Sequence, residues 1–173
     1  MILPLVKSYN PMLTAPTKPF DFISKEYDSK KLSEDLAETM IANKGVGLSA
    51  SQCGIPLSVF VIGDPNNRES IMAFFNPKIV DSFGEEVYYE EGCLSFPGLY
   101  IKVKRPSQIR LRFTDANNNI ATTKYTGFTS RIIQHEFDHL QGIVFTNKAT
   151  TYHLQIGKKN QKLFLRRNKI SVT

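Results

Sequence analysis

Gln134-His135-Glu136-Phe137-Asp138-His139-Leu140 contains two histidines that are separated by one helical turn. On an α-helix, His135 and His139 lie on the same face, so both imidazoles can reach one metal ion. Glu136 lies beside such an ion without having to bind it. A Lewis-acidic cation lowers the pKa of a bound water to about 7, and a neighbouring carboxylate can take its proton. The motif therefore predicts a metal-dependent hydrolase.

The residues around the motif favour a helix. The segment 129–131 leads into Ile132 and Ile133, and Leu140 continues the apolar pattern. Gly142 stands where a left-handed residue would end the helix. The alternative is an ordinary helix with two surface histidines, and only a third ligand separates the two interpretations.

A catalytic zinc or iron site usually has three protein ligands and an open position for water. After His139 the sequence contains no Asp or Glu, and the one remaining histidine is His153, in a polar, basic segment. The third ligand is therefore expected upstream. Cys93 is the best candidate, because a thiolate binds Fe(II) or Zn(II) strongly and Gly92 lets the backbone approach closely. Taken alone, Cys93 is more typical of a small buried hydrophobic residue.

Length and composition indicate one domain. The 173 residues are 41% hydrophobic, which is enough for one sizeable core. Cys53 and Cys93 are too few for a disulfide framework, which favours a reducing cytosol. The apolar start of the chain is interrupted by Pro4 and Lys7, so we expect a soluble protein without a signal peptide or a membrane span. We assign residues 1–150 to a catalytic domain and 151–173 to a basic C-terminal tail without a motif.

Residues 1–30 are rich in proline and are expected to form an extended arm without regular structure, laid over the domain. An amphipathic helix is predicted to begin at Asp28 or Ser29, because apolar residues then recur at helical spacing. It should end near Asn43 and Lys44, since Gly45 is a good C-cap residue.

The middle of the chain is predicted to form strands. Gly84 is expected to be the turn of a hairpin between 79–83 and 87–90, and 115–119 a second turn. A helix, mixed strands and then the metal-binding helix indicate an α+β domain. The predicted strands are 57–62, 71–75, 79–83, 87–90, 100–105, 109–113 and 120–125.

The segment 157–169 carries six basic residues and no acidic one, which equals the formal net charge of +6. Apolar residues 163–165 lie among them. Such a segment can contact ribosomal RNA or an acidic membrane, and a solvated, partly disordered tail is the simpler interpretation. The six are Lys158, Lys159, Lys162, Arg166, Arg167 and Lys169.

Three segments together resemble the signature motifs of peptide deformylases, in the family's order. They are Gly45-Val46-Gly47-Leu48-Ser49-Ala50-Ser51-Gln52, Glu91-Gly92-Cys93-Leu94-Ser95 and Gln134-His135-Glu136-Phe137-Asp138-His139. The resemblance covers roughly residues 1–149. Two positions depart from the usual pattern: Ser49 stands where the family usually has Ala, and Tyr100 where some members have Arg. We expect Ser49 to leave the site unaltered.

The resemblance implies the fold of the family, with mixed or antiparallel sheets packed around a central metal-binding helix. It also implies the reaction, which is hydrolytic removal of the N-formyl group from the initiator methionine of nascent polypeptides, with release of formate. Cys93, His135 and His139 would bind one divalent metal, with Fe(II) as the native ion and Zn(II), Ni(II) or Co(II) as alternatives. Glu136 would transfer protons.

By the same resemblance, the side-chain amide of Gln52 and the backbone N–H of Leu94 would donate hydrogen bonds to the oxyanion. The peptide would lie extended against residues 46–48, and its methionine side chain would enter an apolar pocket. The residues expected to contact the substrate are Val46, Gly47, Gly92, Phe128 and Ile132.

Asp138 is expected to accept a hydrogen bond from a metal-bound histidine, and Arg105 is a candidate partner for Asp138. We expect a cytoplasmic enzyme of a bacterium or a phage host, although an organelle fits too. Ribosome contact through 157–169 would suit this function, and no DNA partner is expected.

Two other functions remain open at this point. A thermolysin-like metallopeptidase has the same helix motif, but it takes a third ligand from a downstream carboxylate that this chain lacks. A deformylase relative without catalytic activity would use its groove or its basic tail to bind a partner. The presence of Glu136 and Gln52 argues against such a binding module.

Overall fold

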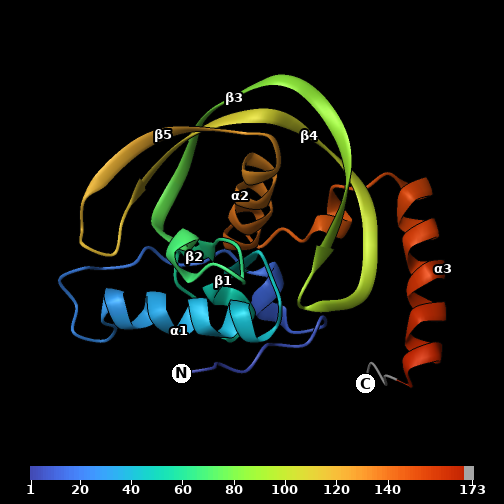
Figure 1. The fold of residues 1–173 in the computed structure, drawn as a ribbon, viewed down its shortest axis with the longest axis horizontal. Coiled ribbons are helices and arrows are strands. Elements are labelled where there is room, and N and C mark those ends of the chain that lie inside the picture. Colours follow the sequence, from blue (N-terminus) through green and yellow to red (C-terminus); the bar gives the residue numbers. More distant parts are fainter. Residues whose placement is uncertain (170–173) are drawn as a thin grey trace.

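The computed structural model describes residues 1–169 (Figure 1). These residues contain three α-helices and one antiparallel sheet of five strands, in the order β1-β2-β3-β4-β5. Every strand pairs with its neighbour in the sequence, so short connections are sufficient. The predicted α+β class is confirmed. The elements are η1 (Pro11–Thr14), α1 (Ser29–Ala42), β1 (Gly47–Ser49), η2 (Ala50–Cys53), β2 (Val59–Ile62), η3 (Arg68–Ser70), β3 (Met72–Cys93), β4 (Phe96–Thr114), β5 (Ile120–Thr126), α2 (Gly127–Leu140), η4 (Phe145–Asn147) and α3 (Thr151–Asn168).

The predicted metal-binding helix is α2, and it stands at the centre of the molecule with β3, β4 and β5 arching over it (Figure 1). Its inner face packs Ile133 and Leu140 against the sheet. Gly142 follows the helix with a φ of 70°, as predicted, and a side chain there would collide with the backbone of Thr14 and Ala15. The arm and the helix end therefore fix each other.

Helix α1 begins where the sequence predicts. The carboxylate of Asp28 accepts a hydrogen bond from the backbone N–H of Lys31, which caps the helix. Leu36 and Met40 are fully buried, and burying each contributes about 1.5–3 kcal/mol. At the other end the residue with positive φ is Lys44 (55°) rather than Gly45. The predicted boundary is right, but the left-handed residue is not the glycine.

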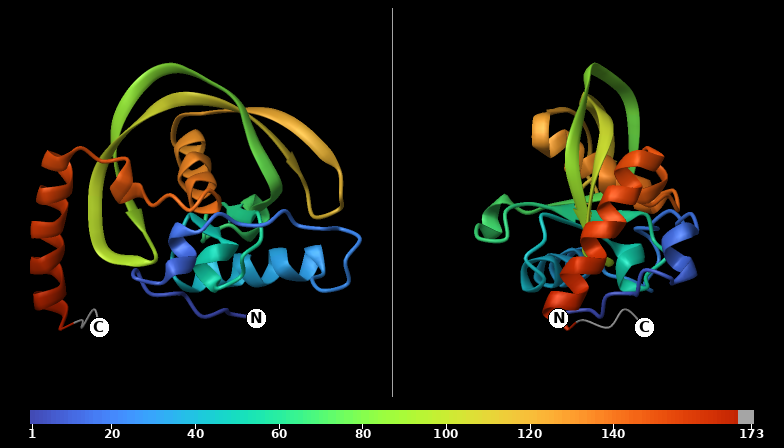
Figure 2. Two further views of the ribbon diagram at one scale, coloured as in Figure 1. Left: turned by 180° about the vertical axis from the view of Figure 1, so that it is seen from behind. Right: turned by 90° about the vertical axis from the view of Figure 1, so that its right-hand side faces the viewer.

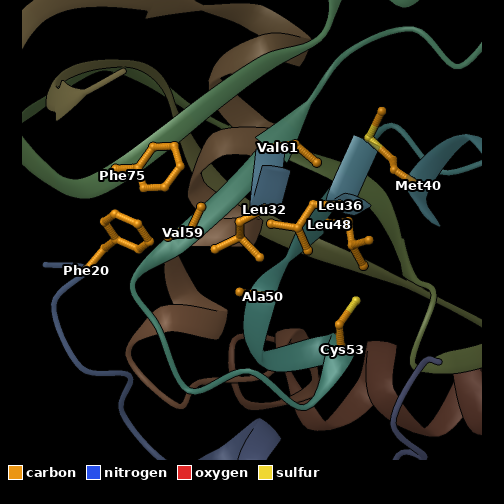
Figure 3. Packing of buried hydrophobic residues seen from close by; sticks show 10 residues of the cluster. All are labelled: Phe20, Leu32, Leu36, Met40, Leu48, Ala50, Cys53, Val59, Val61 and Phe75. Carbon is orange, nitrogen blue, oxygen red and sulfur yellow. The ribbon is translucent and has the colours of Figure 1, made fainter. Parts of the chain in front are cut away.

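The core beneath the sheet joins α1 to β1, β2 and the N-terminal arm (Figure 3). Phe20 of the arm packs edge-on against Phe75 of β3, with ring centroids 4.8 Å apart. The arm is extended apart from η1, so the prediction of no regular structure is wrong for that one turn. Its position over the domain is confirmed by hydrogen bonds from Val6 N to Gln52 O and from Thr17 N to Leu140 O.

Strand β3 runs without interruption through Gly84, so the predicted hairpin at this glycine is wrong. Gly84 has a φ of 80° and lies at a register shift between Phe83 and Glu86, which is a bulge. The hairpin that joins β3 to β4 instead lies between Cys93 and Phe96. A bulge and a turn can both require a positive φ, which favours glycine. Only the pairing of β3 with β4 shows which of the two forms at Gly84. The second predicted turn, at 115–119, is confirmed, with Asp115 N donating to Asn119 O.

The segment 157–169 was predicted to be a solvated and partly disordered tail, and the prediction of disorder is wrong: these residues belong to helix α3 (Thr151–Asn168) and its C-cap Lys169. Thr150 caps the helix through the backbone N–H of His153, and Gly157 packs against Tyr100 and Ile101 of β4. Helix α3 lies at one side of the molecule and β5 at the other, as both views show (Figures 1 and 2). Residues 170–173 of the predicted tail lie outside the described part of the chain. No helix within residues 1–169 is long and apolar enough to cross a membrane.

Candidate active site

Helix α2 presents His135 and His139 one turn apart, with their ring centroids 5.1 Å apart. Cys93 reaches them from the end of β3, and its Sγ lies 3.3 Å from Nε2 of His139. One donor atom from each of these three residues lies within 4.8 Å of the others. A thiolate and two imidazoles are a donor set that suits a divalent transition metal such as iron or zinc. The three predicted ligands are therefore brought together from two elements.

Glu91 holds the second ring nitrogen of His135. Its Oε2 lies 3.1 Å from Nδ1, which leaves Nε2 of the imidazole free to bind a metal. Asp138 is predicted from the sequence to be this carboxylate, and that prediction is wrong, because its oxygens contact Arg105 and Lys148 instead. Glu91 stands two residues before Cys93 in the same motif, and this position was the signal that could have identified it.

Two buried arginines surround the Glu91 carboxylate. Arg105 donates to it through Nε at 2.6 Å and Nη2 at 3.0 Å, and Arg131 donates through Nη1 at 2.8 Å. Burial would raise the pKa of Glu91, but hydrogen bonds from His135 and Arg105 outweigh it and lower this pKa to about 2. The carboxylate is therefore ionised and locked in place. No motif or spacing in the sequence points to Arg131 in this role.

Asp138 lies on the far side of Arg105. Its Oδ2 accepts from Nη1 of Arg105 at 2.7 Å, and its Oδ1 lies 3.5 Å from Nζ of Lys148. The predicted pairing of Arg105 with Asp138 is thus confirmed. Asp138 holds the guanidinium of Arg105, Arg105 holds the carboxylate of Glu91, and Glu91 contacts His135. Asp138 therefore supports the histidine only indirectly.

The two histidines lie in different electrostatic environments. Burial would lower the pKa of His135, but its hydrogen bonds to Cys93 and Glu91 outweigh burial and raise the pKa well above the ordinary value. Burial lowers the pKa of His139 well below that value, and its Nδ1 has no hydrogen-bond partner among the described residues. Both rings must be neutral at the nitrogen that binds a metal.

Glu136 is buried beside the ligands, and its Oε2 has no hydrogen-bond partner in the described part of the chain. Burial is the largest effect on its pKa and raises it to about 7. Gly47 lies directly against it, because a Cβ atom on Gly47 would be 2.5 Å from Oε1 of Glu136. Glu136 also lines a cavity, and an unpaired carboxyl oxygen at such a place is suited to receive a proton from a small molecule.

Gln52 approaches the sulfur of Cys93 from η2. Its Nε2 lies 3.3 Å from both Cys93 Sγ and Ser95 Oγ. Its Oε1 accepts from the backbone N–H of Ser49 at 3.0 Å and from the Ser49 hydroxyl at 3.1 Å. These contacts fix the amide with its NH₂ group toward the site. The hydroxyl of Ser49 thus contacts a site residue, although the sequence analysis expected no effect from it.

A cavity of about 370 Å³ opens above these groups. Tyr100 lies across Gly92, where a Cβ atom would be 2.7 Å from the tyrosine ring, so the glycine makes room for this side chain. Phe128 lines the cavity, and its ring packs against that of Tyr89, with centroids 6.0 Å apart. His139, the third predicted ligand, is almost fully buried and does not line this cavity. The predicted site residues that line the cavity are Val46, Gly47, Gln52, Gly92, Cys93, Leu94, Phe128, Ile132, His135 and Glu136.

Comparison with known proteins agrees with this geometry. A peptide deformylase of Prochlorococcus marinus (strain NATL1A) is 40% identical over 148 residues, which are 83% of this chain and 72% of the relative. Peptide deformylase 1 of Bacillus cereus is 39% identical over 152 residues, covering 88% and 95% of the two chains.

Solved structures resemble the chain over almost its whole length. A crystal structure of a peptide deformylase from Legionella pneumophila has a TM-score of 0.86 and 27% identity, and covers 99% of both chains. One from Plasmodium falciparum has a TM-score of 0.85 and 31% identity, and covers 98% of this chain and 99% of the other. The model of the polypeptide deformylase family matches residues 2–155, so the chain belongs to this family.

Proposed function

We propose that Cys93, His135 and His139 hold one divalent metal ion and that Glu136 is the acid–base group of the deformylation reaction. As a peptide deformylase, the enzyme removes the N-formyl group from nascent polypeptides. The observation that carries the site assignment is the convergence of the three donor atoms next to the unpaired Oε2 of Glu136. A bound ion supplies Lewis acidity, which activates water and polarises the formyl carbonyl.

Fe(II) is the proposed native ion. One thiolate and two imidazoles also accept Zn(II), Ni(II) or Co(II). Elemental analysis of anaerobically purified protein should give about one metal ion per chain. Protein without a transition metal that gains no activity on addition of Fe(II) or Ni(II) would contradict this assignment.

Glu136 moves the proton. Its Oε2 accepts a proton from the attacking water, and the carboxylic acid then returns it to the methionine nitrogen as the bond between carbon and nitrogen breaks. Formate and a free amino terminus are the products. Arg105, Arg131 and Glu91 hold His135 in one orientation throughout, because their hydrogen bonds are buried and mutually satisfied.

Gln52 and Leu94 stabilise the oxyanion in this proposal. Nε2 of Gln52 points to Cys93, and the backbone N–H of Leu94 follows Cys93 directly in the hairpin. Each donor of this kind contributes about 2.7–4 kcal/mol to transition-state stabilisation. Ser49 supports the first donor through its hydrogen bond to Oε1.

The peptide binds as an added strand on β1. This strand is at one end of the sheet order, so one of its edges is free within the sheet. In this proposal the formyl end of an antiparallel peptide lies at Gly47, because Gly47 touches Glu136, and the following residues run toward Lys44. The methionine side chain enters between Val46, Phe128 and Ile132, which line the cavity.

Ribosome contact through 157–169 remains a proposal, now with these cations on α3 instead of on a tail. Helix α3 uses Gly157 and Phe164 to contact β4, and its exposed charges point elsewhere. A cytoplasmic location, in a bacterium or a phage host, suits the same proposal.

Turnover of a formyl-Met-Ala-Ser peptide tests the function directly. Formate release should depend on a transition metal and should be lost on treatment with a strong chelator. The same assay with the unformylated peptide should show no cleavage of internal peptide bonds. Internal cleavage without formate release would favour a metallopeptidase instead.

A further inference from the structure

The outer face of the arching sheet carries a cluster of cations that the active site does not use. Along β4, Ile109 and Leu111 are buried toward α2, whereas Arg110 and Arg112 point outward and are exposed. Arg112 pairs in register with Lys78 of β3, and Arg110 pairs with Lys124 of β5. We call these four residues, Lys78, Arg110, Arg112 and Lys124, the basic sheet face.

The other half of the same outer face is electrically balanced. Lys104 of β4 pairs with Glu86 of β3 at 2.8 Å, and Lys102 stands opposite Glu90 in the register. Two cations therefore face two anions. Natural sheets usually match opposed charges in this way, because opposite charges across strands are favourable.

The basic sheet face lacks this balance. Asp81, opposite Arg110, is the one acidic residue in register with these four cations. Like charges that stand directly opposite, as Lys78 and Arg112 do, destabilise a sheet. No ion pair involving any of the four occurs within residues 1–169. Lys124 instead lies over the ring of Phe83, 5.0 Å from its centroid.

Strand geometry fixes the spacing of these charges. Opposed residues on neighbouring strands are about 5 Å apart, and alternate residues along a strand are about 7 Å apart. The result is a small grid of positive charge on a rigid surface. Two of its members are arginines, whose planar guanidinium groups bind phosphate through two hydrogen bonds.

We propose that the basic sheet face binds the phosphate backbone of RNA. The choice of RNA rests on the proposed function, because a nascent chain is met beside an RNA-rich particle. A membrane surface fits less well, since binding to a bilayer requires apolar side chains that enter it. In the register, Thr122 stands opposite Arg112, and the exposed large apolar residues beside the face are Val80 of β3 and Ile120 at the end of β5, too few to enter a bilayer.

The surface is separate from both other functional regions. None of its four residues lines the cavity of about 370 Å³, so bound RNA leaves the substrate path open. It lies toward β5, whereas α3 with its own basic residues lies at the opposite side of the molecule (Figures 1 and 2). Neutralising one surface therefore leaves the other intact.

The test compares two double variants of the full-length protein. R110A/R112A and K102A/K104A remove the same charge from the same face of the same strand, and only the first touches the basic sheet face. Fluorescence anisotropy with a labelled RNA hairpin of about 20 nucleotides, at about 50 mM salt, measures Kd. R110A/R112A should weaken binding about tenfold and lower the slope of log K against log salt by about 1 to 2. K102A/K104A should change Kd less than twofold.

Three results would overturn the proposal: no RNA binding by the wild-type protein, an equal loss in both variants, or a loss confined to the α3 variant K158A/K159A. The wild-type protein could instead bind vesicles containing phosphatidylserine and not RNA. If R110A/R112A loses this vesicle binding, the face is assigned to a membrane. Both β4 variants should keep the wild-type melting temperature and kcat/KM on a formyl-Met peptide. A wild-type protein that turns over a formyl-Met peptide but does not bind RNA rejects this inference alone, and a wild-type protein that binds RNA without turnover rejects the proposed function alone.

Discussion

Oε2 of Glu91 lies 3.1 Å from Nδ1 of His135, although 44 positions separate the two residues in the sequence. The side chain of Glu91 is 4% exposed, and its other partners are two guanidinium groups. The same carboxylate therefore orients a proposed metal ligand and neutralises buried positive charge.

Glu91→Gln should damage both the fold and metal binding. The amide removes the charge that compensates Arg105 and Arg131, and breaking a buried pair of this kind costs about 3–5 kcal/mol. Metal affinity should fall about 10- to 100-fold as His135 loses its support. Urea unfolding and a chelator competition assay measure the two effects. Glu86→Gln on the same strand, with an exposed partner, is the control; equal behaviour of the two variants would reject the role of Glu91.

Glu136→Ala should keep its metal and lose turnover. Glu136 is assigned to proton transfer and not to binding, and removal of a positioned acid–base group costs about 10² to 10⁴ in kcat. The isosteric Glu136→Gln should behave in the same way, which separates loss of the proton carrier from loss of volume. Kinetics on a formyl-Met peptide and metal analysis are measured on the same preparation. Loss of the metal, or near-normal kcat, would show that the assignment is wrong.

Gly47→Ala should reduce activity without removing the metal. The added Cβ would lie 2.5 Å from Oε1 of Glu136 and 2.8 Å from Cγ2 of Ile132, so the carboxyl group proposed to transfer the proton has to move. A displacement of about 1 Å at this position can cost about 10²-fold in kcat/KM. Gly127→Ala is the control, because a Cβ there meets nothing within 4 Å. Its φ of 58° should cost stability, but its turnover should remain normal.

Ser49→Ala should lower kcat by about 2- to 12-fold, which corresponds to one hydrogen bond of about 0.5–1.5 kcal/mol. The hydroxyl of Ser49 lies 3.1 Å from Oε1 of Gln52 and helps to hold the amide. In a Gln52→Ala background the same substitution should have no further effect on kcat, because its target is gone. Additive losses in this double-mutant cycle would mean that Ser49 acts by another route.

Phe164→Ala should destabilise the protein by about 1–2 kcal/mol. The ring lies over Gly98, where a Cβ atom would be 2.8 Å from Cγ of Phe164, so helix and hairpin fit closely. A loss of this size lowers Tm by about 2–4 °C per kcal/mol. Leu163→Ala, at a neighbouring exposed position, should leave Tm nearly unchanged. For the same reason, truncation after Thr151 should lower Tm; an unchanged Tm would contradict the packing role of α3.

The sequence by itself determined the local elements of this protein. Spacing of one helical turn places His135 and His139 on one face, and the capping carboxylate of Asp28 defines where α1 begins. The turn at 115–119 was predictable for the same reason, because Asp115 bonds to backbone groups only two and four residues away. Each of these features depends on contacts within a few residues, so the chain carries the information locally.

Only the tertiary structure decided how distant residues meet. Glu91, Arg105 and Arg131 are each plausible surface charges in the sequence, and they become a buried network because β3, β4 and α2 pack together. Gly84 became a bulge instead of a turn because β4 continues beside it. Residues 151–168 became a helix against β4 because Gly157 and Phe164 fit the strand, and no local signal encodes that fit. Burial and pairing across the chain, not spacing along it, set these outcomes.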